Sequence, residues 1–575
     1  MTNQIALKIG GAAGQGVKTS GYILTKALKD LGQWIFSYSE YPSLIRGGHS
    51  TYQINIDTKK IHSVTKRVDI LIALNEETIE KHYEEIKENG ILLCDDGFKI
   101  SEKIDNYLKE KKISIVKVTV DEIVKKNQGL PVMNNSVITG AVWSLLTSEY
   151  TYLEDKVKEI FSEKDKNIQT NLSCTKDGFD FVSKGDFPKF NLSVKETKDI
   201  ILGTGNEVAG LATYASGCRL YCAYPMTPST GILQYLAQRA YKLGMIVKQA
   251  EDEITAIQMS IGGSFAGTRS ACGTSGGGLA LMTESLSFIG MIETPLVVFD
   301  SQRPGPATGT PTWTEQGDLD FVSKAGHGEF PRIILAPGDI DEVFKLVSEA
   351  FNLADKFQTV IIILLDKYIS ESWYLTEKFD DSDIKVDRGE LLTQEELDKQ
   401  KDFERYKITD SGISKRSMPG MKNGIFLANS DEHDGKGYST EELGIRKEMM
   451  EKRMRKLKGI KLILPEPTLY GDENAKTTII CWGSQKGPIL DAVNELNEKG
   501  IKINMLNYSY VFPLKIEKLE KLAKTNKLIA VENNFSGQFA DLIRKETGID
   551  ISDRVVKYDG TPFFKDELLD ILESK

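Results

Sequence analysis

The chain has 575 residues, of which 40 % are hydrophobic and 27 % are charged, and its formal net charge is −10. Because a single hydrophobic core stops growing at about 250–300 residues, we expect two to four domains. The acidic balance argues against a nucleic-acid-binding protein, and no apolar run reaches the ~20 residues that span a membrane. The N-terminal MTNQIALKIGG is too short and polar for a secretory signal, so we expect a cytoplasmic protein.

The first predicted unit alternates strands and helices. IALKIGG (5–11) is typical of a strand that enters a glycine turn, and the pattern at 21–32 predicts the helix that follows and ends at Gly32. Residues 68–75 and 88–96 are short apolar runs of the kind found in buried parallel strands, and 137–150 predicts a helix that closes the unit. From about 170 to 198 the sequence loses its periodicity. We therefore predict a first domain at 1–185 and a linker at 186–198.

Two further α/β units are predicted. A strand, turn and helix at 199–217 precede apolar strands at 294–303, 331–338 and 359–368, which gives a domain at 199–375. The last unit, 460–575, contains buried strands at 476–484 and 526–534 and an amphipathic helix at 487–500 that stops at Gly500. The predicted fold class is α/β, with three successive doubly wound units.

The connecting region, 376–459, is polar and irregular except for a basic helix near its end. Met450, Met454 and Leu457 lie at i, i+4 and i+7 along this helix and predict an apolar face. The lysines and arginines of the opposite face fit either a solvated surface or a docking surface for an acidic partner, and we favour the solvated surface.

The cysteines and histidines do not predict a metal site. Cys218 and Cys222 form an isolated C-x3-C pair, and the other four cysteines stand alone. A metal clip and a pair of small buried residues both fit this spacing, and the second is favoured because zinc needs four ligands.

Two glycine loops follow strands and open helices. In GGAAGQGVKTS, Gly11 and Gly16 have the separation of a P-loop, but Val17 stands before Lys18 and Thr19. The loop GTGNEVAG at 203–210 is two residues too long for the dinucleotide fingerprint. Free N–H groups at a helix start attract anions, so a phosphate-bearing ligand and a simple tight turn both remain open for the first loop.

Three residues of the central domain are candidates for chemistry. Thr227 lies between two prolines at the end of a predicted strand, where open α/β sheets bind ligands. Glu253 adjoins the apolar face of a predicted helix, so its carboxylate is a candidate for burial. Arg303 directly follows an apolar strand, and its planar fork suits a carboxylate ligand. Each residue also has a plain alternative: a helix cap, a solvated carboxylate and a surface ion pair.

The motifs around these residues resemble those of the 2-oxoacid:ferredoxin oxidoreductases. The central domain contributes YPMTPST, QAEDEITAI, GTSGGGLALMTESL and VVFDSQRPGPATGTPTWTEQGDL. GGAAGQGV and EYPSLIRGGHSTYQINI look like the family's γ domain, and YKITDSGISKRSMPG, ANSDEHD and EKRMRKL look like its region between the α domains. The resemblance covers nearly the whole chain and implies an α subunit with a fused N-terminal γ domain. It also implies that the central unit is a pyrimidine-binding-type domain and the last is transketolase-C-terminal-like.

The resemblance implies an enzyme that uses thiamine diphosphate. A 2-oxoacid is decarboxylated to CO2 and an acyl group on coenzyme A, and the electrons pass to ferredoxin. A separate β subunit would hold the diphosphate, its Mg2+ and a [4Fe-4S] cluster, in a heterodimer or a dimer of heterodimers. The cysteine pattern agrees with this division, since four grouped cysteines are missing here.

Residue roles are implied by the same resemblance. Tyr224, Pro225, Thr227, Arg303 and Thr312 would contact the 2-oxoacid, with Arg303 on its carboxylate. Glu253 would bind the aminopyrimidine N1′, and Glu251 is the alternative if the register differs. Gly11, Gly14 and Gly16 are candidates on the coenzyme A side.

One departure from the family pattern bears on the substrate. Trp313 stands where a basic residue is expected after Pro-Thr, which favours an apolar or aromatic oxoacid over 2-oxoglutarate. Met226 for isoleucine and Gly277 for proline are minor. The rival interpretations are a transketolase-like thiamine enzyme without ferredoxin and a non-catalytic nucleotide-binding scaffold.

Overall fold

The structure is a computed structural model that describes residues 4–44, 47–161, 167–196, 198–380, 382, 384–400 and 402–575. Ile45 and Arg46 of the γ-like motif and Thr197 of the predicted linker lie outside the described residues. The chain divides into two compact units. The first contains Met1–Gly203, Ser372–Lys378 and Phe564–Lys575, and the second contains Thr204–Glu371 and Phe379–Phe563.

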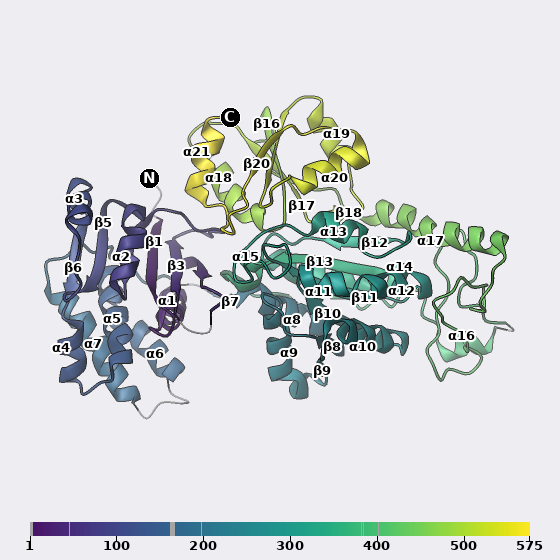
Figure 1. Cartoon of the computed structure of the whole chain (residues 1–575), viewed down its shortest axis with the longest axis horizontal. Helices are drawn as coiled ribbons and strands as arrows, with labels where there is room; N and C mark the ends of the chain where they lie inside the picture. The colour runs from purple at the N-terminus through teal and green to yellow at the C-terminus, as the bar shows by residue number, and fades with distance from the viewer. Residues whose placement is uncertain are drawn as a thin grey trace. The chain divides into compact units, whose positions relative to one another are not determined.

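An eight-stranded mixed sheet forms the centre of the first unit, in the order β6-β5-β4-β1-β3-β2-β14-β7 (Figure 1). Six of its strands come from the first 118 residues: β1 (Ile5–Ala12), β2 (Trp34–Glu40), β3 (His49–Asp57), β4 (Val68–Ala73), β5 (Ile86–Asp95) and β6 (Ser114–Val118). The sheet ends with β14 (Trp373–Glu377) and β7 (Ile200–Thr204). The prediction assigned β7 and most of β14 to the second domain and the end of β14 to the connecting region. Pairing between strands distant in sequence leaves no local sequence signal.

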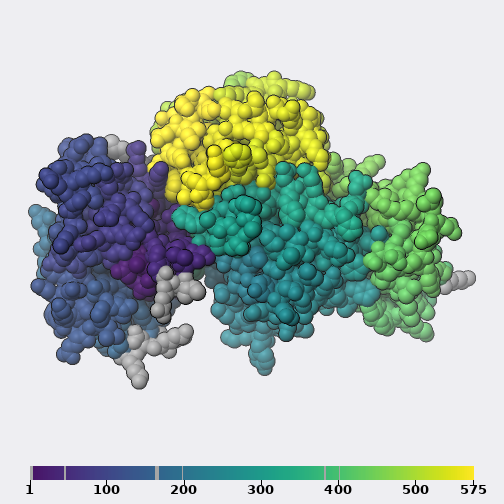
Figure 2. Space-filling view, in the orientation of Figure 1, coloured from purple at the N-terminus to yellow at the C-terminus, as the bar shows by residue number. Residues whose placement is uncertain are grey.

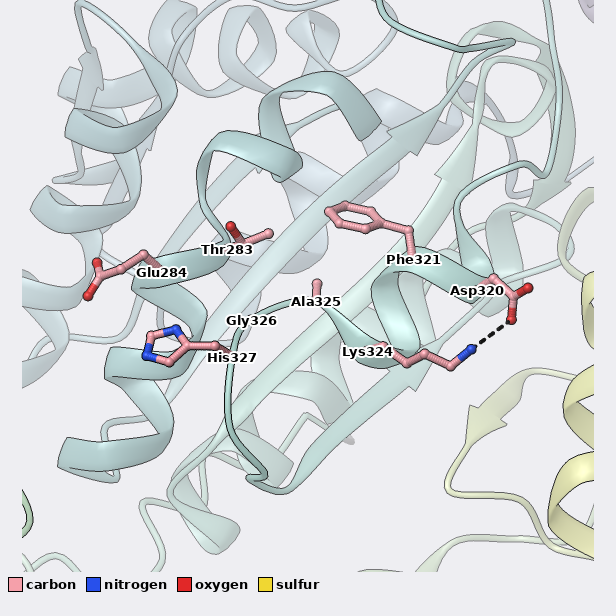
Figure 3. Close-up of a pocket in the computed structure, with 8 residues that line it drawn as sticks. All are labelled: Thr283, Glu284, Asp320, Phe321, Lys324, Ala325, Gly326 and His327. Atoms are coloured by element: carbon pink, nitrogen blue, oxygen red, sulfur yellow. Dashed lines mark ion pairs between the residues drawn. The ribbon is translucent and has the colours of Figure 1, made fainter.

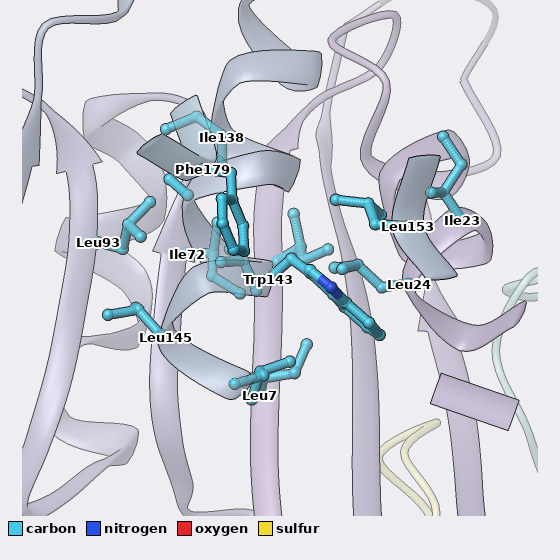
Figure 4. Packing of buried hydrophobic residues seen from close by; sticks show 14 of the residues in the cluster. Leu7, Ile23, Leu24, Ile72, Leu93, Ile138, Trp143, Leu145, Leu153 and Phe179 are labelled. Carbon is cyan, nitrogen blue, oxygen red and sulfur yellow. The ribbon is translucent and has the colours of Figure 1, made fainter. Parts of the chain in front are cut away.

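Helices cover this sheet and bury its core. They are α1 (Val17–Asp30), α2 (Glu76–His82), α3 (Glu102–Glu110), α4 (Val120–Lys126), α5 (Asn134–Leu146), α6 (Tyr150–Phe161) and α7 (Ile168–Lys184). The C-terminal helix α21 (Lys565–Glu573) also belongs to this unit. Trp143 of α5 is fully buried, and Figure 4 shows it among leucine and isoleucine side chains from strands and helices. Its indole N–H donates to the Glu149 carbonyl at 2.9 Å, so the polar edge of the ring is also satisfied.

Helix α7 corrects the expectation that the sequence is irregular from about residue 170. It packs on α5 backbone to backbone: a Cβ on Gly140 would lie 1.9 Å from the Thr175 carbonyl oxygen, and one on Gly178 would lie 2.1 Å from the Val137 carbonyl oxygen. Its buried face therefore consists partly of small and polar residues, and the usual apolar period is weak. The predicted boundary near 185 stays a prediction.

The second unit contains a seven-stranded sheet in the order β18-β12-β13-β11-β10-β8-β9, with β18 antiparallel to β12. Its strands are β8 (Leu220–Ala223), β9 (Ile246–Gln249), β10 (Ser270–Thr274), β11 (Leu296–Gln302), β12 (Arg332–Leu335), β13 (Val360–Asp366) and β18 (Tyr510–Phe512). Its helices are α8 (Gly205–Ala215), α9 (Thr230–Leu243), α10 (Glu253–Phe265), α11 (Gly276–Leu281), α12 (Thr283–Ile292), α13 (Leu319–Lys324), α14 (Ile340–Phe357) and α15 (Lys367–Glu371).

A third, five-stranded sheet belongs to the same unit, in the order β15-β17-β16-β19-β20. Its elements are β15 (Thr468–Gly471), β16 (Thr477–Trp482), β17 (Asn504–Tyr508), β19 (Lys527–Glu532), β20 (Asp553–Val556), α18 (Lys486–Glu498), α19 (Glu517–Ala523) and α20 (Gln538–Thr547). The predicted class, three α/β units in succession, is confirmed. None of the helices in the described part of the chain is long and apolar enough to cross a membrane.

The connecting region contains α16 (Gln394–Asp398) and the long α17 (Leu443–Ile463), drawn in green in Figures 1 and 2. The prediction that the basic face of α17 is solvated is wrong for the middle of the helix, although Lys447, Lys458 and Lys461 are exposed. Lys452 and Lys456 are fully buried, and each ammonium lies 2.5 Å from the Glu293 carboxylate at the end of α12. Arg453 pairs with Glu432 at 2.7 Å. These cations can be buried because each is paired with a carboxylate that is itself buried or half-buried.

Candidate functional site

Arg303 and Thr227, two of the predicted substrate residues, are in contact. The Arg303 guanidinium follows β11, and its Nη1 donates to the Thr227 carbonyl at 2.6 Å. Thr227 follows β8, and both β8 and β11 are parallel neighbours of β10, so the contact lies at the carboxyl edge of the sheet. Tyr224 is 39 % exposed and Pro225 is half-buried on the same segment. The structure thus brings together the arginine and the Thr227 segment, as expected for a ligand site.

Glu253 is the first residue of α10 and is buried, with 4 % of its surface exposed. Asp252 caps the helix: its carboxylate accepts from the Thr255 N–H at 2.7 Å and fixes where α10 begins. A Cβ on Gly278 would lie 2.7 Å from the Glu253 Cγ and 2.9 Å from its Oε1. Glu251 is exposed and precedes the helix, so Glu253 is the better of the two candidates.

The loop after Arg303 holds the third substrate residue, Thr312. It is 6 % exposed, and its hydroxyl has no hydrogen-bond partner among the described residues. The next residues fix its position: the Thr314 hydroxyl accepts from the Tyr368 N–H at 3.2 Å, and the Gln316 side chain donates to the Trp482 carbonyl at 2.9 Å. A buried hydroxyl without a partner is a group that a ligand can satisfy.

Sequence reasoning missed three carboxyls next to these residues. Asp300 on β11 is fully buried, and Asp318 and Glu315 lie in the same loop as Thr312. Burial raises the pKa of Asp318 to about 6 despite the opposing charge of Arg303, and burial together with Asp318 raises the pKa of Glu315 to about 7. Burial lowers the pKa of Arg303, against the charges of Asp318, Asp300 and Glu253. For Asp300 the signal was present in the sequence, as an aspartate inside the apolar run LVVFDSQ.

The predicted glycine loop lies in the first unit, where only part of it borders a cavity. Gly14 and Gln15 line a cavity of about 520 Å³ together with Leu74, Asp95 and Asn135. Gly16 caps α1 with a positive φ of 82°, and Asn135 occupies the space where a side chain would lie. Gly11 is part of β1.

A second cavity, of about 550 Å³, lies in the other unit and contains none of the predicted site residues. Figure 3 shows its lining from α12, α13 and the segment that ends at His327, with the Lys324–Asp320 ion pair at 3.7 Å. Within the described residues, no group of three or more His, Cys, Asp or Glu side chains could hold a metal ion.

Three protein families match successive parts of the chain. Residues 6–181 match "Pyruvate ferredoxin/flavodoxin oxidoreductase", residues 211–452 match "Pyruvate flavodoxin/ferredoxin oxidoreductase, thiamine diP-bdg", and residues 469–549 match "Transketolase, C-terminal domain". These matches define the class of protein: an oxidoreductase subunit linked to ferredoxin or flavodoxin, with a domain of the thiamine-diphosphate-binding type.

Full-length relatives narrow this class. A 2-oxoacid:ferredoxin oxidoreductase subunit alpha of Sulfolobus is 32 % identical over 98 % of this chain and 96 % of its own length. The 2-oxoglutarate oxidoreductase subunit KorA of Mycobacterium tuberculosis is 26 % identical over 98 % of this chain and 90 % of its own. The solved 2-oxoglutarate:ferredoxin oxidoreductase of Magnetococcus marinus, with 2-oxoglutarate, coenzyme A and succinyl-CoA bound, is 28 % identical, with a TM-score of 0.92 over 99 % of both chains. The chain belongs to the 2-oxoacid:ferredoxin oxidoreductase family, as an α subunit.

Proposed function

We propose that this chain, together with a β subunit, converts a 2-oxoacid and coenzyme A to acyl-CoA and CO2 and passes the electrons to ferredoxin. The observation that carries the proposal is the placement of Arg303 against the Thr227 segment, in a unit that also buries the unpartnered Thr312 hydroxyl. Support comes from the Magnetococcus enzyme, which is similar over the full length and was solved with an oxoacid and coenzyme A.

In this proposal Arg303 and the two threonines bind the substrate. Nη1 of Arg303 donates to the Thr227 carbonyl, and this hydrogen bond fixes the orientation of the guanidinium. In the proposal the other N–H groups of the guanidinium donate to the substrate carboxylate. The Thr227 and Thr312 hydroxyls supply further hydrogen bonds. Such positioning matters because decarboxylation requires the carboxylate to be held in place before its electrons move.

Glu253 is proposed to hold the aminopyrimidine of thiamine diphosphate through N1′. The residues fit this group: the carboxyl is buried at a helix start, and Gly278, which has no Cβ, leaves room for the Glu253 side chain. When bound, the cofactor supplies a nucleophilic carbon and an electron sink for the decarboxylation. The part of Glu253 is to accept and return a proton at the pyrimidine nitrogen, in a site from which burial excludes water.

The remaining components are assigned to partners. All six cysteines are buried, and the described residues contain no group of three or more His, Cys, Asp or Glu side chains that could hold a metal ion. We therefore assign the [4Fe-4S] cluster and the Mg2+, and with them the diphosphate site, to the β subunit. The cavity beside Gly14 is the proposed coenzyme A side, with Gly11 and Gly16 shaping its loop. We further propose a cytoplasmic heterodimer or dimer of heterodimers that meets ferredoxin as a separate protein.

The substrate is proposed to be an apolar or aromatic 2-oxoacid, because Trp313 follows Thr312. The backbone N–H of Trp313 donates to the Thr310 carbonyl at 3.1 Å. The side chain packs against Gly560, where an added Cβ would lie 3.1 Å from the Trp313 Cβ. Turnover of pyruvate, 2-oxoglutarate, a branched-chain oxoacid and indolepyruvate tests this, and a clear preference for 2-oxoglutarate would overturn it.

Co-purification with a β subunit, followed by a ferredoxin-reduction assay, tests the proposed function. We expect a brown complex that contains thiamine diphosphate and reduces ferredoxin only when an oxoacid and coenzyme A are present. Oxoacid turnover without ferredoxin reduction would favour the transketolase-like rival. Thermal stabilisation by nucleotides in the absence of turnover would favour the scaffold.

A further inference from the structure

Two aspartates converge behind Arg303. Asp300 lies on β11 and is in register with Thr274 on β10. The Asp318 carboxylate lies against Gly276, two residues after Thr274: a Cβ on that glycine would be 2.5 and 2.6 Å from its two oxygens. The Asp318 N–H donates to the Gln302 side chain at 3.0 Å, which anchors the end of the loop to β11. Both aspartates therefore lie beside the turn that follows β10.

These carboxyls lack partners in the interior. Neither oxygen of Asp300 and only one oxygen of Asp318 has a hydrogen-bond partner or sufficient exposure to water in the described part of the chain. Arg303 is the cation that acts on both, and its Nη1 is used on Thr227. The charge of Asp318 also acts on Glu315, and the charge of Glu253 acts on the same arginine. The charge of one guanidinium is thus shared among three carboxyls, those of Asp300, Asp318 and Glu253, before any substrate is present.

We infer that Asp300 and Asp318 are positioning residues that share one proton, and that binding of a 2-oxoacid carboxylate at Arg303 requires this pair to be protonated. The inference rests on the proposed function. Two desolvated carboxylates beside each other cannot both stay ionised when a third anion arrives. A protonated carboxyl instead offers an O–H donor, whereas an ionised carboxyl only accepts. The proton comes from solvent on binding and returns there on release.

The sign of the pH dependence follows. Burial and the charge of Asp318 raise the pKa of Asp300, and burial raises the pKa of Asp318 to about 6. Below this range the pair is protonated before the substrate arrives, so KM does not depend on pH. Above it a proton must be taken up, and KM for the oxoacid rises by up to about tenfold per pH unit.

The test is KM and kcat of the reconstituted complex between pH 5.5 and 8.5, with the best substrate among the four oxoacids named above. We expect KM to rise with pH in the upper part of this range in the wild type, while kcat changes less. The single variants Asp300→Asn and Asp318→Asn each replace one aspartate of the pair by its neutral isostere. In each variant we expect KM to stay near its low-pH value at every pH. Asp318→Asn alone suffices if Asp300→Asn does not fold.

Two control variants separate this pair from other carboxyls. Burial also raises the pKa of Asp366 to about 6, but this carboxyl accepts from the Ile369 N–H at 2.9 Å, so Asp366→Asn should keep the wild-type rise in KM. Glu315→Gln should keep it too. A rise that persists in both aspartate variants, or disappears in Glu315→Gln alone, overturns the inference. Absence of ferredoxin reduction with every oxoacid would instead overturn the proposed function.

Discussion

Replacing Arg303 by lysine keeps the positive charge and removes the fork. The substitution loses the Nη1 hydrogen bond to the Thr227 carbonyl, 2.6 Å long, and the paired donors proposed for the substrate. Hydrogen bonds of charged groups contribute about 1.5–3 kcal/mol. At 1.36 kcal/mol per factor of ten, kcat/KM should fall by about 10- to 150-fold.

The assay is steady-state ferredoxin reduction by the reconstituted complex. Arg239→Lys is the matched control, because Arg239 lies on α9, stacks on Tyr235 and donates to the Tyr235 carbonyl at 3.1 Å. We expect the control to stay within about twofold of the wild type, since surface substitutions change free energies by less than about 0.5 kcal/mol. An Arg303→Lys complex with unchanged kcat/KM would refute the role of the guanidinium.

Three further predictions concern stability. Gly140→Ala should destabilise the protein by at least about 1–3 kcal/mol, because the added Cβ meets the Thr175 carbonyl. The Cβ added by Gly262→Ala in α10 meets no neighbouring atom, so this control should be neutral or stabilising. Denaturant titration compares the free energies of unfolding of the two variants. Glu293→Gln should lower the free energy of unfolding by about 3–5 kcal/mol, because it leaves Lys452 and Lys456 unpaired in the interior. The control Glu451→Gln changes an exposed ion pair and should have little effect. Similar denaturation midpoints for the two variants would contradict this prediction. Burial and the charge of His82 lower the pKa of His49 to about 4, so the unfolded state binds the extra proton and stability should fall from pH 6.5 to 4. His49→Gln should flatten that fall, and an unchanged profile would exclude His49 as its cause.

Much of the fold is legible in the sequence because the strands are local, apolar and bounded by turns. The runs at 294–303 and 359–368 correspond to β11 and β13. Helix α18 ends at Glu498, two residues before Gly500, where the sequence predicts the helix to stop. What local patterns do not carry is pairing at a distance. Strands β7 and β14 complete the first sheet although their sequences adjoin the second.

Charge and small residues account for the other differences. The face of α17 that contains Lys452 and Lys456 looks solvated in isolation, and only the buried Glu293, 159 residues away from Lys452, reverses that interpretation. Helix α7 is hidden by its close packing on α5 through Gly178.

The residues of the candidate site also differ in whether a local sequence pattern marks them. Thr227, Arg303, Glu253 and Thr312 are each marked by a proline, strand end, helix face or glycine-rich loop. Asp318 has no such mark, because its proximity to Asp300 depends on how the loop folds back.

The most direct measurement is oxoacid-dependent ferredoxin reduction by the complex of this chain with its β subunit, charged with thiamine diphosphate and coenzyme A. We predict reduction by the wild type, with CO2 released in step, and loss of at least about 100-fold in Glu253→Ala, since catalytic proton transfer contributes at least that factor. Equal reduction by the variant, or none by the wild type with any oxoacid, would contradict the account.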